Sequence, residues 1–344
     1  MGRVRGCETQ RTVAIPDEPG AYPRAVLERF VWDRPQEPCE LGATEFQEYL
    51  DYLRRLAPHP GVGFFGPGSV AWAVNREWAL NLGGLRALLM QVAHPKVAEG
   101  VLRHSRFTRD PFGRALNTVR AVQAIIFGTA DEACEVARQV YLRHLRVRGP
   151  MPQDVPAAVR GSYDATDPAL TLWVHATLIE SAVFTLGLLF GPLSDQRSDA
   201  LYQEGKLFAL FFGITPRLLP GSWGEFRGWF DKQLSWPYWF ATHASRRVAG
   251  ALLGDIWWGR PLSPLLRFWA AYTLPDPMRQ RLGLRLTSHH RKLGRCLADV
   301  VARILDRLPA LCRYTPRYRS AMARIAARGS PSAEQPTVPV VRVS

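Results

Sequence analysis

Residues 168–190 form the segment that most constrains how this chain folds. The stretch "PALTLWVHATLIESAVFTLGLLF" is mostly apolar, and its ionisable residues are His175 and Glu180. Asp167 and Pro168 are typical of the cap and first turn of a helix. Its length would permit a membrane span, but ionisable groups near the middle are costly in lipid. We therefore expect a helix buried on all sides within a large helical bundle.

Helix patterns also dominate the rest of the chain, and strand-like alternation is nearly absent. The sequence predicts an all-α fold with one large helical domain over residues 25–328, an irregular segment over 1–24 and a disordered tail over 329–344. Further helices are expected at 25–56 (two short ones), 70–92, 95–104, 111–127, 130–148, 194–212, 223–232, 236–253, 262–272, 276–286 and 290–308.

The net charge of +14 is concentrated in one part of the sequence. Residues 279–328 hold thirteen Lys or Arg and two acids, Asp299 and Asp306. Solvated helix faces explain such an excess, and an anionic membrane surface or an acidic partner is the alternative. No nucleic-acid reader motif accompanies the charge, so nucleic acid is not expected as a partner.

Cysteine usage and the N-terminal sequence bear on the compartment. The five cysteines are scattered, without a CxxC or Cys/His cluster, so neither a zinc site nor a disulfide framework is expected. Residues 1–20 contain no apolar stretch of the secretory type. We expect a cytoplasmic protein, with peripheral membrane attachment as an option.

Polar side chains recur on four consecutive predicted helices, at positions where a packing core would not choose them. His144 lies on the apolar side of the 130–148 helix, and His175 lies within the apolar helix. Arg114 and Thr118, spaced i and i+4, share one face of the 111–127 helix, and His94 closes the helix before it. Because burial of such groups requires partners, we expect them to share a pocket.

Several chemistries can be set aside for this pocket. The sequence lacks HExxH or paired carboxylates for zinc, ExxH repeats for a di-iron centre, and the GxSxG turn of a serine hydrolase. Haem needs one imidazole, an apolar slot between helices and a cation near its propionates. His144 and Arg114 meet that description loosely.

Four stretches, taken together and in order, resemble one bacterial family over roughly residues 70–290. They are "LLMQVAHPKVAEGVLRHSRFTRDPFGRALNTVRAVQAIIFGT", "VYLRHLRVRG", "YDATDPALTLWVHATLIES" and "FGPLSD". The family is the domain of unknown function 2236. It includes the latex-clearing rubber oxygenases and the fungal oxygenase that cleaves a farnesyl side chain in mycophenolic acid synthesis.

The resemblance implies an all-helical fold with a buried pocket for haem b. It implies that His144 is the proximal iron ligand and that Arg114 and Thr118 lie beside the haem. Asn117 stands where the latex-clearing enzymes have a lysine that can occupy the distal iron position. Because asparagine is a poor iron ligand, the sixth position is expected to be open or to hold water.

Two more histidines and one glutamate complete the implied site. His175 matches a second family histidine, with a structural or supporting role. His94 is the first alternative as an internal sixth ligand. Glu99 lies near the glutamate proposed as the base, where it would take an allylic proton.

The expected function is that of a haem-dependent oxygenase. Its partners would be O₂ and a hydrophobic small molecule, isoprenoid or unsaturated, whose C=C bond is cleaved to two carbonyl products. The alternative is a non-catalytic helical protein that uses the same pocket to bind haem or a lipid.

Overall fold

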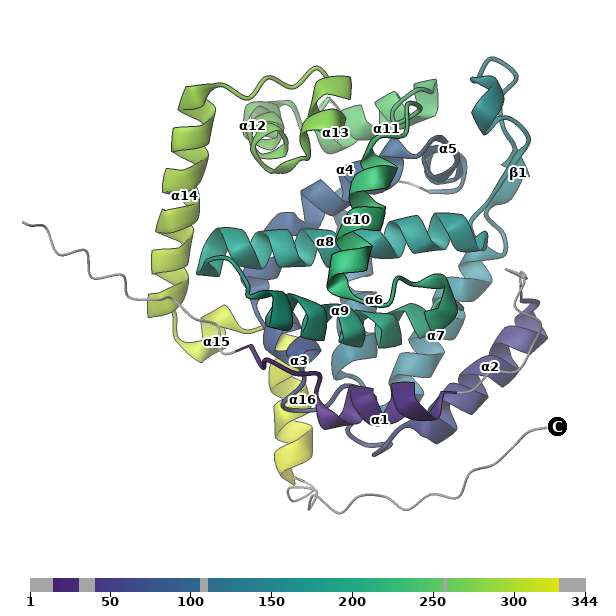
Figure 1. Ribbon diagram of the computed structural model, residues 1–344, viewed down its shortest axis with the longest axis vertical. Coiled ribbons are helices and arrows are strands. Elements are labelled where there is room, and N and C mark those ends of the chain that lie inside the picture. Colours follow the sequence, from purple (N-terminus) through teal and green to yellow (C-terminus); the bar gives the residue numbers. More distant parts are fainter. Residues whose placement is uncertain (1–14, 31–40, 106–110, 256–258, 328–344) are drawn as a thin grey trace, which may run out of the picture.

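The computed structural model describes residues 15–30, 41–105, 111–255 and 259–327. Within them the architecture is all-α, as predicted, with helices α1 to α16 and short 3-10 turns (Figure 1). One small antiparallel hairpin joins β1 (Arg148–Pro150) to β2 (Ser162–Asp164), and Gly149 pairs with Tyr163. The sequence pattern gave no indication of this hairpin.

The apolar helix α8 (Pro168–Phe190) runs through the middle of the bundle (Figure 1). Asp167 caps it, since its Oδ1 accepts a hydrogen bond from the backbone N–H of Ala169 at 2.8 Å. It contacts α4 (Gly84–Ala93), α9 (Asp195–Leu210), α14 (Ser288–Arg307) and the 3-10 helix η1 (Trp78–Gly83). By length and composition α8 is the one described helix that could cross a membrane. Contacts on several sides are those of a core helix.

The two ionisable residues of α8 have different surroundings. Glu180 pairs with Arg86 of α4, whose guanidinium is almost fully buried and also lies over the Phe184 ring. Both ring nitrogens of His175 are buried and find no hydrogen-bond partner among the described residues. A packing role thus accounts for Glu180 and leaves His175 unexplained.

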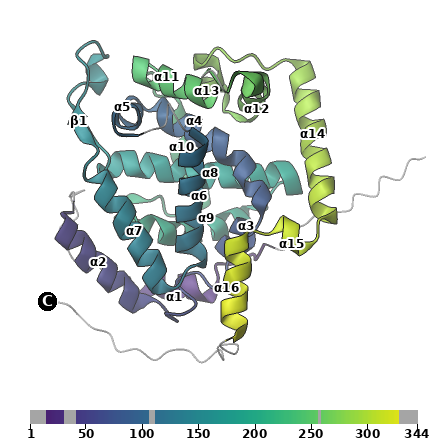
Figure 2. The same ribbon diagram turned by 180° about the vertical axis from the view of Figure 1, so that it is seen from behind.

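A helical hairpin carries two of the predicted site residues. It consists of α6 (Pro111–Phe127) and α7 (Ala130–His144), which lie on the face shown in Figure 2, and α7 packs against α2 (Ala43–Leu56). A capping box starts α7, since Thr129 Oγ1 and Glu132 Oε2 each accept a hydrogen bond from the other residue's backbone N–H at 3.2 Å. The helix was expected to continue to residue 148. It ends at His144 because the chain turns there into β1.

The helix predicted over residues 70–92 is divided into α3 (Val70–Asn75), η1 and α4. Glu77 is fully buried in an ion pair with Arg313, and this contact accompanies the first break. At Gly83 a β-carbon would stand 2.2 Å from Thr185 Oγ1, so the residue between η1 and α4 has to be glycine. These tertiary contacts override the local helix pattern.

The remaining helices surround this centre. Residues 236–253 form a helix only from His243, because Phe240 adopts φ +56° while its N–H donates to Ala93. The C-terminal helices follow one edge of the molecule, from α14 through α15 to α16 (Figure 2). The other bounds are α1 Ala21–Arg29, α5 Pro95–His104, α10 Trp223–Leu234, α11 His243–Leu252, α12 Ser263–Thr273, α13 Asp276–Arg281, α15 Ala310–Arg313, α16 Pro316–Ala327, η3 Ala157–Val159, η4 Pro216–Leu218 and η5 Arg260–Leu262.

The two ends of the chain were expected to be non-helical. Helix α1 begins at Ala21, inside the segment 1–24 that was expected to be irregular. The tail predicted over 329–344 lies outside the described residues, as does Asp110, which precedes α6 and is of a residue type that caps helices.

Candidate functional site

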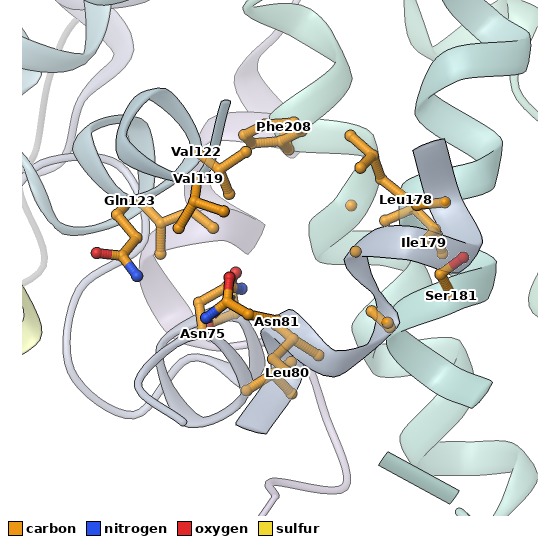
Figure 3. Close-up of a pocket in the computed structure, with 18 of the residues that line it drawn as sticks. Asn75, Leu80, Asn81, Val119, Val122, Gln123, Leu178, Ile179, Ser181 and Phe208 are labelled. Carbon is orange, nitrogen blue, oxygen red and sulfur yellow. Dashed lines mark hydrogen bonds between the residues drawn. The ribbon is translucent and has the colours of Figure 1, made fainter. Parts of the chain in front are cut away.

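A cavity lies at the centre of the bundle, between α8 and the hairpin helix α6 (Figure 3). Its cavity volume is about 180 Å³, and it opens to solvent at its mouth. Most of the wall is apolar and comes from α3, η1, α4, α6, α8 and α9. Its apolar side chains include Val74, Leu80, Leu88, Val119, Val122, Ile126, Leu178, Ile179 and Phe208.

Carboxamides supply much of the polar surface in this wall. Asn75, Asn81 and Gln123 are grouped in Figure 3, and Gln91 of α4 also contributes. The amide nitrogens of Asn75 and Asn81 donate to backbone carbonyls of Ala71 and Trp78 at 2.9 Å, and their oxygens accept no hydrogen bond from the described residues. We call Asn75, Asn81 and Gln123 the amide group. An uncharged hydroxyl or carbonyl would suit it as a ligand.

Two carboxylates in the cavity wall are already engaged. Glu204 accepts three backbone N–H bonds, from Gly20, Val70 and Ala71, at 2.7, 2.9 and 2.6 Å. Glu77 accepts from Arg313 Nε at 2.7 Å. Both side chains therefore hold the fold together, and neither offers an idle base to a ligand.

His144 and two arginines form a basic corner at one end of the α6–α7 hairpin. Burial, and after it the nearby charges of Arg114 and Arg143, lower the pKa of His144 to about 4. Protein atoms around the Arg114 guanidinium lower its pKa, and the charge of Arg143 adds to the effect, although Arg114 keeps contact with solvent. The charge of Asp164 raises the pKa of His144. Its Oδ2 also forms an ion pair with Arg148 Nε at 3.6 Å. His144 is thus a neutral imidazole beside two cations.

The basic corner, defined as Arg114, Arg143 and His144, adjoins the cavity through α6. Thr118 and Ala115 line the cavity, and Arg114 immediately precedes Ala115. The Thr118 hydroxyl donates to the Arg114 carbonyl at 3.2 Å within the same helix. Arg114, Thr118 and His144, three of the predicted site residues, are therefore brought to one region, and Thr118 is the one in the cavity wall.

His175 lies next to the cavity in the core. Its ring stacks on Phe208, which lines the cavity, with 6.2 Å between ring centroids. Leu178 and Ile179, one turn further along α8, also line the wall. Burial lowers the pKa of His175 to about 4, so the ring is neutral near pH 7. A buried imidazole without a hydrogen bond is costly, which makes this ring a candidate to contact a bound group.

Three predicted residues lie away from the cavity wall. Glu99 is buried on α5, and its Oε1 accepts from Arg103 Nε at 2.5 Å. His94 caps α5, where its Nδ1 accepts from the Lys96 N–H, and it stacks on Trp236 with 5.1 Å between centroids. Asn117 is exposed one turn after Arg114, and Arg120 donates to its Oδ1. Their contact with a cofactor stays a prediction.

Sequence reasoning missed the amide group and Arg143. Helical spacing placed Val119, Val122 and Ile126 on one side of α6, and Gln123 belongs to that same side. An amide on an apolar helix face was thus visible in the sequence. Asn75 and Asn81 were not, because the breaks around η1 decide where they point.

No group of three His, Cys, Asp or Glu side chains suited to a metal ion occurs in the described ranges. Haem needs only one imidazole from the protein as an iron ligand, and the described residues can supply one.

One known protein family matches most of this chain. Residues 71–303 match the family described as "ER-bound oxygenase mpaB/B'/Rubber oxygenase, catalytic domain". The chain belongs to this family. The match includes the basic corner and every cavity-lining residue except Phe65, and it ends within α14.

Two curated relatives are similar to part of the chain. They are uncharacterised proteins from Mycobacterium tuberculosis and Mycobacterium bovis, each 33% identical over 149 residues, or 42% of this chain. The chain spans about half of the length of these relatives, 54%. No solved structure matches the chain.

Proposed function

We propose that this protein is a haem-b-dependent oxygenase that acts on an apolar, unsaturated small molecule. Membership of the mpaB/rubber oxygenase family supports oxygenase chemistry in general. The basic corner is the observation that supports haem. It offers a neutral imidazole as iron ligand and two cations for carboxylates.

The electrostatics of the corner fit an anionic group that carries a metal. Arg114 and Arg143 form no ion pair within the part of the chain that the structure describes. Each lowers the pKa of His144, so the corner repels a further proton or cation. Haem propionates would relieve that repulsion, and the unprotonated His144 would be free to ligate iron.

Each residue then has a defined task. When bound, haem would supply the chemistry with O₂ that side chains lack. His144 would hold the iron, and Arg114 and Arg143 would bind the propionates. Thr118, in the cavity wall next to this corner, would adjoin both the cofactor and the substrate. The apolar walls would exclude water from the reacting bond.

The cavity supports an elongated apolar substrate with one polar end. Val119, Val122 and Ile179 offer aliphatic contacts, whereas the amide group offers hydrogen bonds without charge. A prenyl alcohol or a quinone with an unsaturated tail has this combination. Binding at the amide group would orient the chain and fix which C=C bond is presented.

The proposed reaction is oxidative cleavage of a C=C bond. The double bond is broken, and each atom of O₂ ends in one of two carbonyl products, so no external reductant is required. Glu99 would take an allylic proton in this scheme. Its carboxylate would first have to exchange the Arg103 contact for the substrate.

A non-catalytic haem- or lipid-binding protein is the second candidate. The observation that favours it is the absence of an idle carboxylate in the cavity wall, where Glu77 and Glu204 are both engaged. Glu99, the proposed base, also lies outside that wall. The two functions differ in O₂ consumption.

Haem titration of the purified protein tests the cofactor assignment. The wild type is expected to bind one haem per chain with a Soret band, and His144→Ala to lose it. His175→Ala, which removes an imidazole of similar pKa, is the matched control and should retain haem. Equal retention in both variants would reject His144 as the ligand. No binding by the wild type would reject haem.

A further inference from the structure

We propose that helix α14 docks this protein on an anionic membrane surface. Four large apolar side chains of α14 are exposed: Leu293 at 50%, Leu297 at 36%, Val300 at 41% and Ile304 at 53%. Their spacing of four, three and four residues places them in one row along the helix. We call these four residues the apolar stripe.

The apolar stripe is not the face by which α14 packs on the protein. That face is formed by small residues and one leucine, namely Gly294, Ala298, Ala302 and Leu305, all of which are buried. The ring of Tyr272 lies so close to Gly294 that a β-carbon there would meet it at 2.4 Å. Helix α14 thus has two apolar sides, one covered by α8 and α12 and one left in solvent. It stands at the outer edge of the molecule (Figure 1).

Charges around α14 are arranged asymmetrically about the apolar stripe. At about 100° per residue, Arg303 and Arg307 lie within about 90° of the centre of the stripe. The two acids, Asp299 and Asp306, lie about 130–150° away from it. A row of apolar side chains with cations beside it is the pattern of helices that lie in an anionic lipid interface.

This charge pattern favours a membrane over a second copy of the chain. Two stripes packed together would bring Arg303 and Arg307 of both copies close to one another. Asp299 and Asp306 lie about 40–60° around the helix from Arg303, but they are further from the stripe than either arginine. Anionic headgroups supply the missing negative charge, and the lipid interior accepts the apolar side chains.

The 3-10 helix η1 lies between the packing face of α14 and the cavity. Its Ala79 packs against Leu305 of α14, and its Leu82 carbonyl accepts from Trp269 of α12 at 2.9 Å. Trp78 and Leu82 of η1 are themselves exposed, at 40% and 37%. Leu80 and Asn81 of the same short helix line the cavity. Helix η1 therefore contacts α14 and also forms part of the cavity wall.

Vesicle sedimentation of the full chain tests the docking face without reference to haem. Binding is expected to vesicles of phosphatidylserine and phosphatidylcholine at low salt, to weaken as salt rises, and to be absent with phosphatidylcholine alone. Failure of this result would leave the proposed oxygenase function untouched, because docking and haem binding are measured separately.

Two pairs of substitutions on α14 distinguish membrane binding through the cations beside the stripe from binding through net charge. Arg303→Gln with Arg307→Gln is expected to weaken vesicle binding about 25-fold, from the loss of two cations at the surface. Arg291→Gln with Arg295→Gln removes the same charge about 150–170° from the stripe and should have a smaller effect. Equal weakening by both pairs would overturn the proposal and assign binding to net charge.

The apolar part is tested by Leu293→Gln with Ile304→Gln, and Met322→Gln of α16 is the exposed apolar control. Loss of vesicle binding in the first variant and retention in the second are expected. No binding of the wild type at low salt would refute docking. A concentration-dependent dimer that the stripe variant abolishes, without vesicle binding, would assign the stripe to a second copy.

Discussion

Replacement of His175 by leucine tests the electrostatics of the core. His175 is 3% exposed, and its two ring nitrogens have no hydrogen-bond partner within the described residues. Leucine keeps an apolar side chain of comparable size beside Phe208 and removes both buried nitrogens. The cost of an unsatisfied buried polar group is about 1–3 kcal/mol. The cofactor-free variant should therefore be at least as stable as the wild type at pH 7.

The same substitution should change how stability depends on pH. Burial lowers the pKa of His175 to about 4, against about 6.5 in the unfolded chain. The unfolded state therefore takes up the proton first as the pH falls through this window. The stabilisation is complete above about pH 6.5 and is lost progressively as the pH approaches 4. From pH 7 to pH 5 the loss is about 2 kcal/mol.

Urea denaturation of cofactor-free protein at pH 7 and pH 5, followed by tryptophan fluorescence, measures this difference. The fall in unfolding free energy between the two pH values should be about 2 kcal/mol smaller in His175→Leu than in the wild type. His289→Leu is the control, because its ring on α14 is exposed to water in the folded protein.

Two results would refute the argument. An unchanged difference between pH 7 and pH 5 would mean that His175 is not a buried, neutral imidazole. A large loss of stability at pH 7 would mean that the ring has a hydrogen-bond partner.

Three further predictions concern the walls of the site. Glu204→Leu leaves three buried N–H groups without an acceptor, so thermal and urea unfolding should show a loss of about 3–5 kcal/mol, whereas Glu18→Gln, in an exposed ion pair with Arg24, should cost under about 1 kcal/mol. Gln123→Leu should weaken binding of farnesol about 5-fold by calorimetry and leave binding of the hydrocarbon farnesene unchanged; equal effects on both would remove the amide group from substrate recognition. Arg114→Gln should lower haem affinity in a Soret titration while the iron ligand stays in place, and Arg120→Gln, on the exposed side of α6, should not; an unchanged affinity in the first variant would place the propionates elsewhere.

The all-α architecture could be predicted because helix signals in this sequence are local. Asp167 with Pro168 and the Thr129–Glu132 capping box each fix a helix start within one turn, and the structure confirms both. The apolar surface of 168–190 predicted its place in the core, but only ten of its 23 residues are buried, so the expected burial on all sides was wrong. These features depend on residues close in the chain.

The parts that could not be predicted depend on contacts between distant residues. Helix 70–92 is broken where Glu77 pairs with Arg313 and where Gly83 meets Thr185. Neither contact can be recognised from the sequence of residues 70–92 alone. The same holds for the cavity: sequence spacing grouped Arg114 and Thr118, but only the tertiary structure shows the amide group of Asn75, Asn81 and Gln123.

The local sequence pattern also could not decide which histidine would be the haem iron ligand. His94, His144 and His175 all have a pKa lowered to about 4 by burial, so electrostatics alone does not separate them. Their neighbours do. His94 is engaged as a helix cap, His175 stacks on Phe208, and His144 lies beside two arginines that lack a carboxylate.

The central claim is tested most directly by the fate of ¹⁸O₂ in the haem-loaded protein. With geranylgeraniol as substrate, mass spectrometry is expected to show two carbonyl fragments whose masses add up to the cleaved chain, each with one ¹⁸O before exchange with water. His144→Ala, taken through the same loading procedure, should give neither fragment. A haem-loaded wild type that consumes no O₂ and returns geranylgeraniol and other unsaturated isoprenoids intact would contradict the account and leave a binding protein.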